Sequence, residues 1–179
     1  MSIKEAGFSK RMLDILMSAS RLDAVNRSAM MDTPPEHAFD ELSGMAATVM
    51  QTPVAQVTFM GDERQWFKSS LNFPAQEAPV ATSFCAHTIT STDSVKVVLD
   101  AENDPVFATN PFVANPPGVR FYAGCPIEVW GENIGTICVY DFEARDTVTD
   151  GQVDTLRDLA KQAALLVINN REKSAKPAA

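Results

Sequence analysis

The hydrophobic positions change their spacing twice along the chain. Up to about residue 52 they recur every three or four positions, which predicts helices. Short β-prone runs occupy the middle of the chain, and the helical spacing returns after residue 149. The predicted helices cover residues 8–16, 22–31, 34–52 and 149–168. Because helices and strands come in separate blocks and do not alternate, the pattern favours an α+β fold with a central antiparallel β-sheet.

Two pairs of β-prone runs predict hairpins, the second of them closed by a turn at Gly131–Asn133. The predicted strands are residues 54–60, 65–70, 95–99, 120–127 and 135–141. A short helix is expected at 84–89. Residues 101–118 contain four prolines and three asparagines, which predicts a long irregular loop. Loops of this length in a compact domain are more often lids or binding segments than filler.

Two segments carry the signature of a capping box, in which side chains three positions apart satisfy free amides at a helix start. Thr33 and Glu36 form the first, with Pro34 where a missing N–H costs nothing. Thr149 and Gln152 form the second. Helices are therefore expected to begin at both places.

Composition narrows the class of protein. The 179 residues, 45% of them hydrophobic, suit one domain with a real core. A net charge of −8 argues against nucleic acid as a partner. No apolar run approaches the roughly 20 residues of a membrane helix, and no signal-peptide core is present, so we expect a cytoplasmic protein without membrane contact. The spacing of Cys85, Cys125 and Cys138 suits neither a disulfide framework nor a zinc site, which predicts reduced thiols and no metal.

Five blocks of residues stand out in order along the chain. They are Asp32–Glu36 with Phe39–Asp40, Arg64–Ser69, Ser83–His87 (Ser-Phe-Cys-Ala-His), Asp104–Pro105 with Asn110–Pro111, and the hairpin opening with Phe121–Gly124 (Phe-Tyr-Ala-Gly). Together they resemble one large subgroup of the GAF domain family, over about residues 24–167. The resemblance implies a GAF/PAS-like sheet with N- and C-terminal helices on one face and a pocket on the other, covered by loops 73–89 and 101–118.

The resemblance also implies domain limits and a function. We expect a helical extension at 1–22, a GAF domain at 23–170 and a disordered tail at 171–179. The implied function is that of a small-molecule-binding sensory domain in bacterial-type signal transduction, with an unidentified ligand and a kinase or cyclase partner in trans. No nucleophile elbow, phosphate loop or carboxylate pair is present, so no catalytic residue is assigned and no enzyme is expected.

Three alternatives to a plain sensor stay open within the resemblance. One is a GAF-type free methionine-R-sulfoxide reductase that uses cysteine chemistry. Another is a protein-interaction or dimerisation module without a pocket. A covalent bilin on Cys85 is a minor third, because the adjacent Cys-His pair of such photoreceptors is replaced by Cys-Ala-His. GAF relatives commonly pair through helices, and the final predicted helix is apolar beyond the stripe of about 100° that one sheet covers, so a homodimer through the terminal helices is expected.

The candidate pocket residues come from these blocks and from the strand rows beside them. They are Trp66, Phe84, Cys85, His87, Asp104, Phe107, Arg120, Tyr122 and Cys138. Arg120 suits either an anionic ligand group or a carboxylate, Asp100 or Asp104, that pins the loop. Trp66 could pack in the core or offer its ring to a ligand. Cys85 and His87 could be a structural pair, or His87 could activate the Cys85 thiol. Cys85 is expected to be the most reachable thiol.

Overall fold

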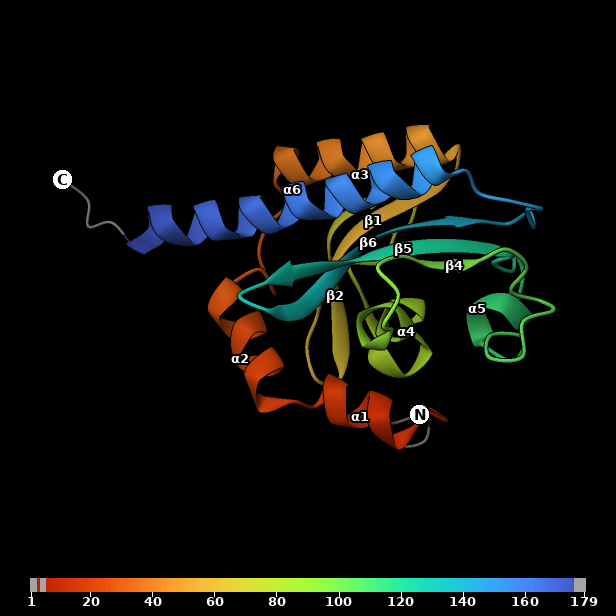
Figure 1. The fold of residues 1–179 in the computed structure, drawn as a ribbon, viewed down its shortest axis with the longest axis horizontal. Coiled ribbons are helices and arrows are strands. Elements are labelled where there is room, and N and C mark those ends of the chain that lie inside the picture. The colour runs from red at the N-terminus through yellow and green to blue at the C-terminus, as the bar shows by residue number, and fades with distance from the viewer. Residues whose placement is uncertain (1–2, 4–5, 176–179) are drawn as a thin grey trace.

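The chain forms one antiparallel sheet with strand order β3-β2-β1-β6-β5-β4 (Figure 1). The computed structural model describes residue 3 and residues 6–175. The strands are β1 Val54–Met60, β2 Arg64–Leu71, β3 Glu77–Pro79, β4 Lys96–Val98, β5 Phe121–Val129 and β6 Glu132–Asp141. The helices are α1 Lys10–Leu16, α2 Ala19–Ser28, α3 His37–Met50, α4 Phe84–Thr90, α5 Pro111–Ala114 and α6 Asp150–Ala175, with a 3₁₀ turn at Val80–Thr82. The α+β class with a central antiparallel sheet is therefore confirmed.

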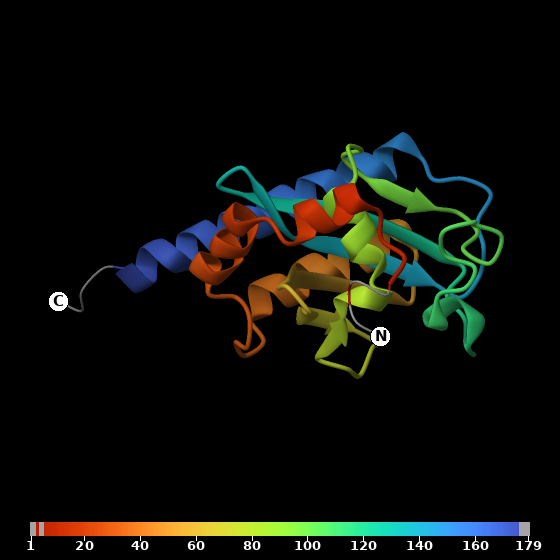
Figure 2. The ribbon, with the colours of Figure 1, turned by 90° about the horizontal axis from the view of Figure 1, so that it is seen from below.

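Helices cover both faces of the sheet, and they divide unequally. The long helices α3 and α6 lie side by side across one face, whereas α2 lies below one end of the sheet, where it contacts β6 and α6 (Figure 1). On the opposite face α4 packs against β5 and β6, and α1 packs against α4 (Figure 2). The first predicted helix thus lies on the face opposite to the one expected, because its apolar residue Leu16 is buried among the residues around α4.

The two-residue period of the strands decides which side chains meet which helices. Ile137 and Val139 of β6 are buried in the core beneath α3 and α6, whereas Cys138 between them belongs to the opposite core. In β5 the same alternation puts Phe121 on the helix side and Tyr122 on the other. Each central strand therefore supplies two cores of different chemistry.

The two predicted capping boxes have different outcomes. The second forms: Gln152 Oε1 accepts from the Thr149 amide at 3.0 Å, and Thr149 Oγ1 accepts from the Gln152 amide at 3.2 Å. The first does not, and α3 begins at His37 instead of Pro34. The buried ammonium of Lys68 donates to Thr33 Oγ1 at 2.7 Å and pairs with the Glu36 carboxylate at 2.6 Å, so both capping side chains are already engaged.

A buried arginine joins the N-terminal helices to the sheet. Arg21 of α2 is 1% exposed and donates to three backbone carbonyls, those of Leu16, Met60 and Gly61. Burial lowers the pKa of its guanidinium to about 10, so it stays charged at neutral pH. These bonds fix the end of α1 and the start of α2 against the end of β1.

The last helix passes the expected domain limit. α6 continues to Ala175, so residues 171–175 of the segment expected as a tail are helical. The remaining residues of that segment lie outside the described part of the chain. No helix in the described residues is both long and apolar enough to cross a membrane.

Candidate functional site

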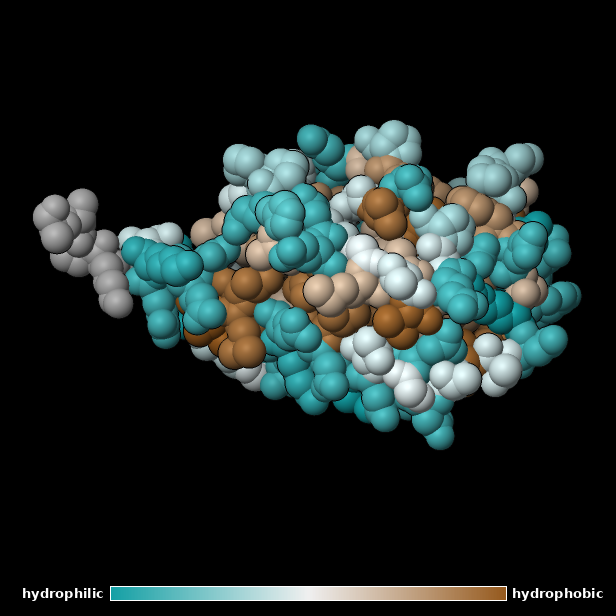
Figure 3. Space-filling view, turned by 90° about the horizontal axis from the view of Figure 1, so that it is seen from above, coloured by the Kyte–Doolittle hydropathy of each residue, from teal (hydrophilic) through white to brown (hydrophobic). Residues whose placement is uncertain are grey.

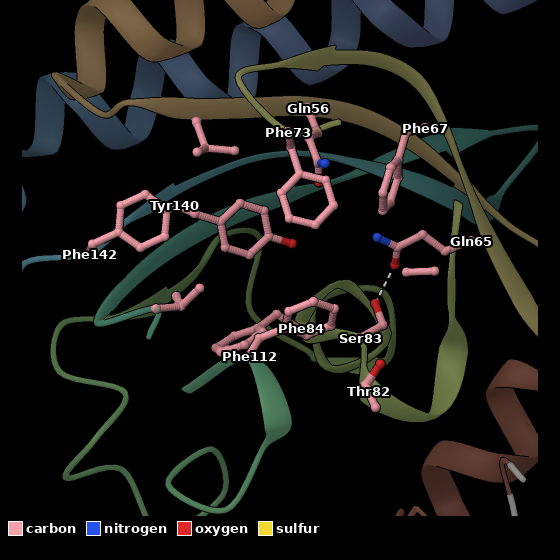
Figure 4. Close-up of a pocket in the computed structure, with 13 residues that line it drawn as sticks. Gln56, Gln65, Phe67, Phe73, Thr82, Ser83, Phe84, Phe112, Tyr140 and Phe142 are labelled. Atoms are coloured by element: carbon pink, nitrogen blue, oxygen red, sulfur yellow. Dashed lines mark hydrogen bonds between the residues drawn. The ribbon is translucent and has the colours of Figure 1, made fainter. Parts of the chain in front are cut away.

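A small cavity opens on the face of the sheet opposite α3 and α6. Its volume is about 50 Å³, room for a few water molecules. The lining residues are Val54, Gln56, Gln65, Phe67, Phe73, Ala78, Thr82, Ser83, Phe84, Phe112, Val119, Tyr140 and Phe142. Figure 4 shows aromatic rings surrounding a hollow into which a few polar groups project. The cavity is therefore mainly an aromatic site.

Strands supply the floor of this cavity and loops supply its rim. Gln56 of β1, Gln65 and Phe67 of β2 and Tyr140 of β6 project from the sheet. Phe73 comes from the connection after β2, and Phe112 from the short helix α5 within the long loop. Phe112 and Phe142 are 37% and 38% exposed, so these two rings are the least confined of the cavity wall.

The amide side chains of the cavity are oriented by hydroxyl partners. Ser83 is the N-cap of α4, accepting from the Ala86 amide at 3.2 Å, and it donates to Gln65 Oε1. That bond leaves the Gln65 carboxamide nitrogen directed into the hollow (Figure 4). Gln56 donates to Ser70 Oγ at 3.1 Å. The described lining residues carry no formal charge, so the site suits an uncharged ligand that offers a hydrogen-bond acceptor.

Behind the cavity lies a closed cluster of two thiols and two phenols. Cys85 Sγ and Cys138 Sγ are 3.5 Å apart, and both are fully buried. The hydroxyls of Tyr122 and Tyr140 each lie 3.6 Å from Cys85 Sγ. Tyr140 also lines the cavity, so its ring connects the two sites.

The thiol–phenol cluster has distinct titration properties. Burial raises the pKa of Cys138, Tyr122 and Tyr140 well above their usual ranges. Burial also disfavours the Cys85 thiolate, but hydrogen bonds from Cys138, Thr136 and the two phenols outweigh it and lower the pKa of Cys85 to about 6. Cys85 is thus the sulfur that ionises first.

A glycine makes room for one of these phenols. Tyr122 and Gly124 point to the same face of β5. A Cβ on Gly124 would lie 2.1 Å from the Tyr122 hydroxyl, so the Tyr122 side chain occupies the space that a side chain at position 124 would need. The same hydroxyl is 2.6 Å from Thr88 Oγ1 on α4. Gly124 therefore permits the contact between β5 and α4.

The predicted site residues divide between the cavity and the core behind it. Phe84 lines the cavity and stacks on Phe107 at 4.3 Å between ring centroids. Four other predicted residues lie in the core behind the cavity, each with at most 1% of its surface exposed: Phe107, Cys85, Tyr122 and Cys138. The structure thus brings these five predicted residues together, but only Phe84 reaches the cavity wall.

The expectation that Cys85 is the most reachable thiol is wrong. Cys85 lies on helix α4, which turns it inward against the sheet, and it is 0% exposed, as is Cys138. Cys125 is 3% exposed, and burial raises its pKa to about 11.

His87 points away from the thiols and toward aromatic rings. Its ring lies edge-on to Phe107 at 4.8 Å and to Phe8 at 5.3 Å. Burial, with the nearby charge of Lys96, lowers the pKa of His87 to about 4, so the imidazole is neutral at pH 7. Within the described residues no three His, Cys, Asp or Glu side chains gather as a metal site requires.

The other predicted residues lie outside the cavity wall. Arg120 pairs with Glu102 at 3.0 Å and donates to the Val113 carbonyl at 3.0 Å, so it pins the long loop through a carboxylate other than the two expected. Asp104 forms a turn in that loop by accepting from the Val106 amide at 2.8 Å. Trp66 is half-buried, and its buried Nε1 has no hydrogen-bond partner.

Sequence reasoning missed most of the cavity wall. Gln56 pairs in register with Cys138, and Tyr140 follows two positions later, so the row that contains the predicted Cys138 could have indicated both. Phe73 and Phe112 belong to irregular segments, where no period indicates the direction of a side chain.

Comparison with known proteins agrees with the fold. The family model of the GAF domain matches residues 16–167, and the chain belongs to this family. A GAF domain from a phosphoenolpyruvate-protein phosphotransferase of Coxiella burnetii superposes with a TM-score of 0.64 at 16% identity, covering 94% of this chain and all of the other. The phycocyanobilin-bound GAF domain of a cyanobacterial phytochrome gives 0.63 at 14% identity over 88% of this chain and 97% of the other. At these identities the likeness concerns the fold alone.

A curated relative is closer in sequence. A cyclic di-GMP phosphodiesterase of Pseudomonas aeruginosa is 34% identical over 143 residues, which are 79% of this chain and 24% of that protein. The chain thus spans about a quarter of this relative. The expectation that no enzyme is involved is contradicted, because the relative is named as one.

Proposed function

We propose that this chain is a ligand-binding regulatory GAF domain in signal transduction, and that the aromatic cavity is its ligand site. The observation that carries the proposal is the cavity itself, which lies between the sheet and the two long connections. The solved neighbours belong to sensory and signalling proteins, which supports a role of this kind.

The lining defines the class of ligand. Phe67, Phe73 and Phe84 offer flat apolar surfaces, and Gln65 offers an amide donor. The ligand is therefore a flat, uncharged molecule with a carbonyl or ring acceptor. The cavity of about 50 Å³ is smaller than such a molecule, so Phe73 and Phe112 must move outward on binding.

Titration calorimetry with two neutral bicyclic probes tests this proposal. Quinazolin-4-one offers a ring carbonyl, and naphthalene has the same flat bicyclic shape without any acceptor. We expect quinazolin-4-one to bind more tightly than naphthalene by about tenfold, the value of one buried hydrogen bond, and Gln65→Leu to reduce the difference. Equal affinity of the two probes for the natural chain would contradict the donor role of Gln65.

A filled cavity provides the control. Ala78 is 9% exposed and lines the cavity, so Ala78→Leu should block both probes. The matched variant Ala75→Leu, at an exposed position outside the wall, should bind as the natural chain does. Binding of quinazolin-4-one that survives Ala78→Leu would place the ligand elsewhere.

The downstream partner is the second part of the proposal. The sequence predicted a kinase or cyclase as the partner. The name of the relative instead supports an enzyme of cyclic di-GMP turnover as the partner. We propose that occupancy of the cavity modulates a phosphodiesterase of this kind. Mixing the chain with a cyclic di-GMP phosphodiesterase and measuring hydrolysis with and without quinazolin-4-one tests the link.

Pairing through helices is the third part. Exposed apolar side chains gather between α3 and α6 (Figure 3), where Leu165 is 57% and Met45 48% exposed beside Leu42 and Leu166. A second copy of the chain would cover this groove. Because α1 lies on the other face, the proposed dimer uses α6 with α3 instead of both terminal helices.

The reductase alternative rests on the two neighbouring thiols. Cys85 and Cys138 are 3.5 Å apart, the arrangement that an attacking and a resolving sulfur require. Turnover of free methionine sulfoxide with a thiol reductant tests it, and an inactive natural chain would end this alternative.

A further inference from the structure

The two buried thiols on the cavity side of the sheet are arranged as a redox pair. Cys85 on α4 and Cys138 on β6 are 53 positions apart in sequence, and their sulfur atoms are 3.5 Å apart. Cys125, the third thiol, lies in the other core and donates to the Ser94 carbonyl at 3.2 Å. The sheet therefore separates one pair from one single thiol.

The hydrogen bonds around the pair assign different roles to its members. Cys85 Sγ accepts from the Tyr122 hydroxyl at 3.6 Å, and the Tyr140 hydroxyl lies at the same distance. Cys138 Sγ instead donates to the Tyr140 hydroxyl at 3.8 Å. Between the two thiols Cys85 Sγ donates to Cys138 Sγ. When Cys85 loses that proton, the Tyr122 donor stabilises its thiolate, so Cys85 is the nucleophile and Cys138 the resolving thiol.

The Tyr140 ring separates this pair from the cavity, so a small polar oxidant in the cavity would reach the sulfurs when that ring moves aside. Tyr140 is half-buried, lines the cavity and contacts both sulfur atoms through its hydroxyl. The cavity accommodates a few waters and therefore a molecule such as hydrogen peroxide. A bulky alkylating reagent is excluded at the same place.

We propose that Cys85 and Cys138 form a hydroperoxide-sensitive dithiol that closes to a disulfide. The Cys85 sulfur attacks one peroxide oxygen, the O–O bond breaks, and the released hydroxide leaves as water with the Cys85 proton. The resulting sulfenic acid is attacked by the Cys138 sulfur; the S–S bond forms, the S–O bond breaks, and the hydroxide leaves as water with the Cys138 proton. Two thiols are oxidised by two electrons, and one peroxide is reduced to two waters.

The disulfide would act on the neighbouring cavity. Drawing the sulfurs together pulls α4 toward β6, and each element carries a ring of the cavity wall, Phe84 and Tyr140, whose centroids are 6.0 Å apart. Oxidation should therefore lower the affinity for quinazolin-4-one by at least threefold. This consequence rests on the proposed ligand site, whereas formation of the disulfide does not.

Mass spectrometry of the natural chain tests the proposal without any ligand. The chain is treated with hydrogen peroxide, denatured and alkylated. We expect Cys125 to be labelled and two peptides to appear joined through Cys85 and Cys138. A thiol reductant should separate these two peptides. Free Cys85 and Cys138 after treatment, or Cys85 oxidised to sulfinic acid without a joined peptide, would overturn the proposal.

Variants then separate chemistry from folding. Cys125→Ser should form the joined peptide at the natural rate, and Cys138→Ser should leave Cys85 as a sulfenic acid that dimedone traps. Tyr140→Phe removes the hydroxyl that contacts both sulfur atoms and should slow disulfide formation by about three- to tenfold, the value of one hydrogen bond. A natural rate in Tyr140→Phe, with circular dichroism unchanged, would remove the Tyr140 hydroxyl from the mechanism.

Discussion

The two faces of the sheet have different interiors although the same strands build them. Beneath α3 and α6 the core is mainly aliphatic, and its described members take no part in the cavity wall. On the other face the core contains Phe, Tyr and Cys side chains and borders the cavity. The difference shows a division of roles. The aliphatic face supplies most of the buried apolar contacts that stabilise the fold, so the other face can contain a cavity, thiols and phenols.

The alternation within single strands makes this division of labour possible. Val57 is buried beneath the helices, while the neighbouring Thr58 pairs with Thr136 at 3.0 Å on the opposite face. A substitution in a strand therefore changes the packing on the one face to which that side chain points. Four predictions test how separate the two faces are, and they are described from the largest expected effect to the smallest.

Gly135→Ala should damage both faces. A Cβ at this position would lie 2.0 Å from the Thr58 carbonyl oxygen, where β1 and β6 pair at the centre of the sheet. We expect a loss of about 4 kcal/mol or more in the free energy of unfolding, measured by urea denaturation. The control Gly44→Ala, with open space around its Cβ in α3, should be neutral or stabilising by up to about 1 kcal/mol. Near-natural stability of Gly135→Ala would show that the strands can separate there.

Phe39→Ala should destabilise strongly and Phe73→Ala weakly. Phe39 of α3 is fully buried against the sheet, with its ring centroid 6.1 Å from that of Phe59, whereas Phe73 is half-buried at the cavity rim. We expect losses of about 3 kcal/mol and less than about 1 kcal/mol in urea denaturation. Equal losses would mean that the cavity face contributes as much to folding as the helix face.

His87 should make the cavity face sensitive to acid. Its pKa is lowered to about 4 in the folded chain, so the unfolded chain binds the proton first and stability falls as the pH drops from about 6.5 toward 4. The loss should be about 2 kcal/mol at pH 5 and about 3 kcal/mol near pH 4. The carboxyl groups with lowered pKa, such as Glu36, act only below about pH 4.5. Cys85, whose pKa is lowered to about 6, adds a slope of the same sign above about pH 5.5, so the imidazole dominates between about pH 5.5 and 5. Thermal melts of His87→Gln should lose this slope, and those of the exposed control His37→Gln should keep it.

Leu165→Glu should change assembly and leave the fold intact. Leu165 is 57% exposed on α6, so its replacement should alter unfolding by less than about 0.5 kcal/mol. Sedimentation equilibrium should give about twice the 19.5 kDa chain mass for the natural chain and the single mass for the variant. Met17→Glu, at a similarly exposed position on the other face, should stay dimeric. A natural chain that sediments at the single mass would rule the dimer out.

Much of the fold could be predicted because strand period and capping are local signals. Thr149 and Gln152 form the predicted box, but Thr33 and Glu36 do not, since Lys68 competes from a strand distant in sequence. The face that α1 covers could not be predicted, because both faces of the sheet are apolar. At the site, Phe84 was found from its motif, while Phe112 depends on how a loop folds over the sheet.

Hydrogen exchange with and without quinazolin-4-one tests the central claim, that the face opposite α3 and α6 binds the ligand. We predict slower exchange in residues 73–89 and 101–118 when the probe is bound, because Phe73 and Phe112 lie on these segments and close over it. Exchange in α3 and α6 should stay the same. Unchanged exchange in both loops at saturating probe, or protection confined to α3 and α6, would contradict the account.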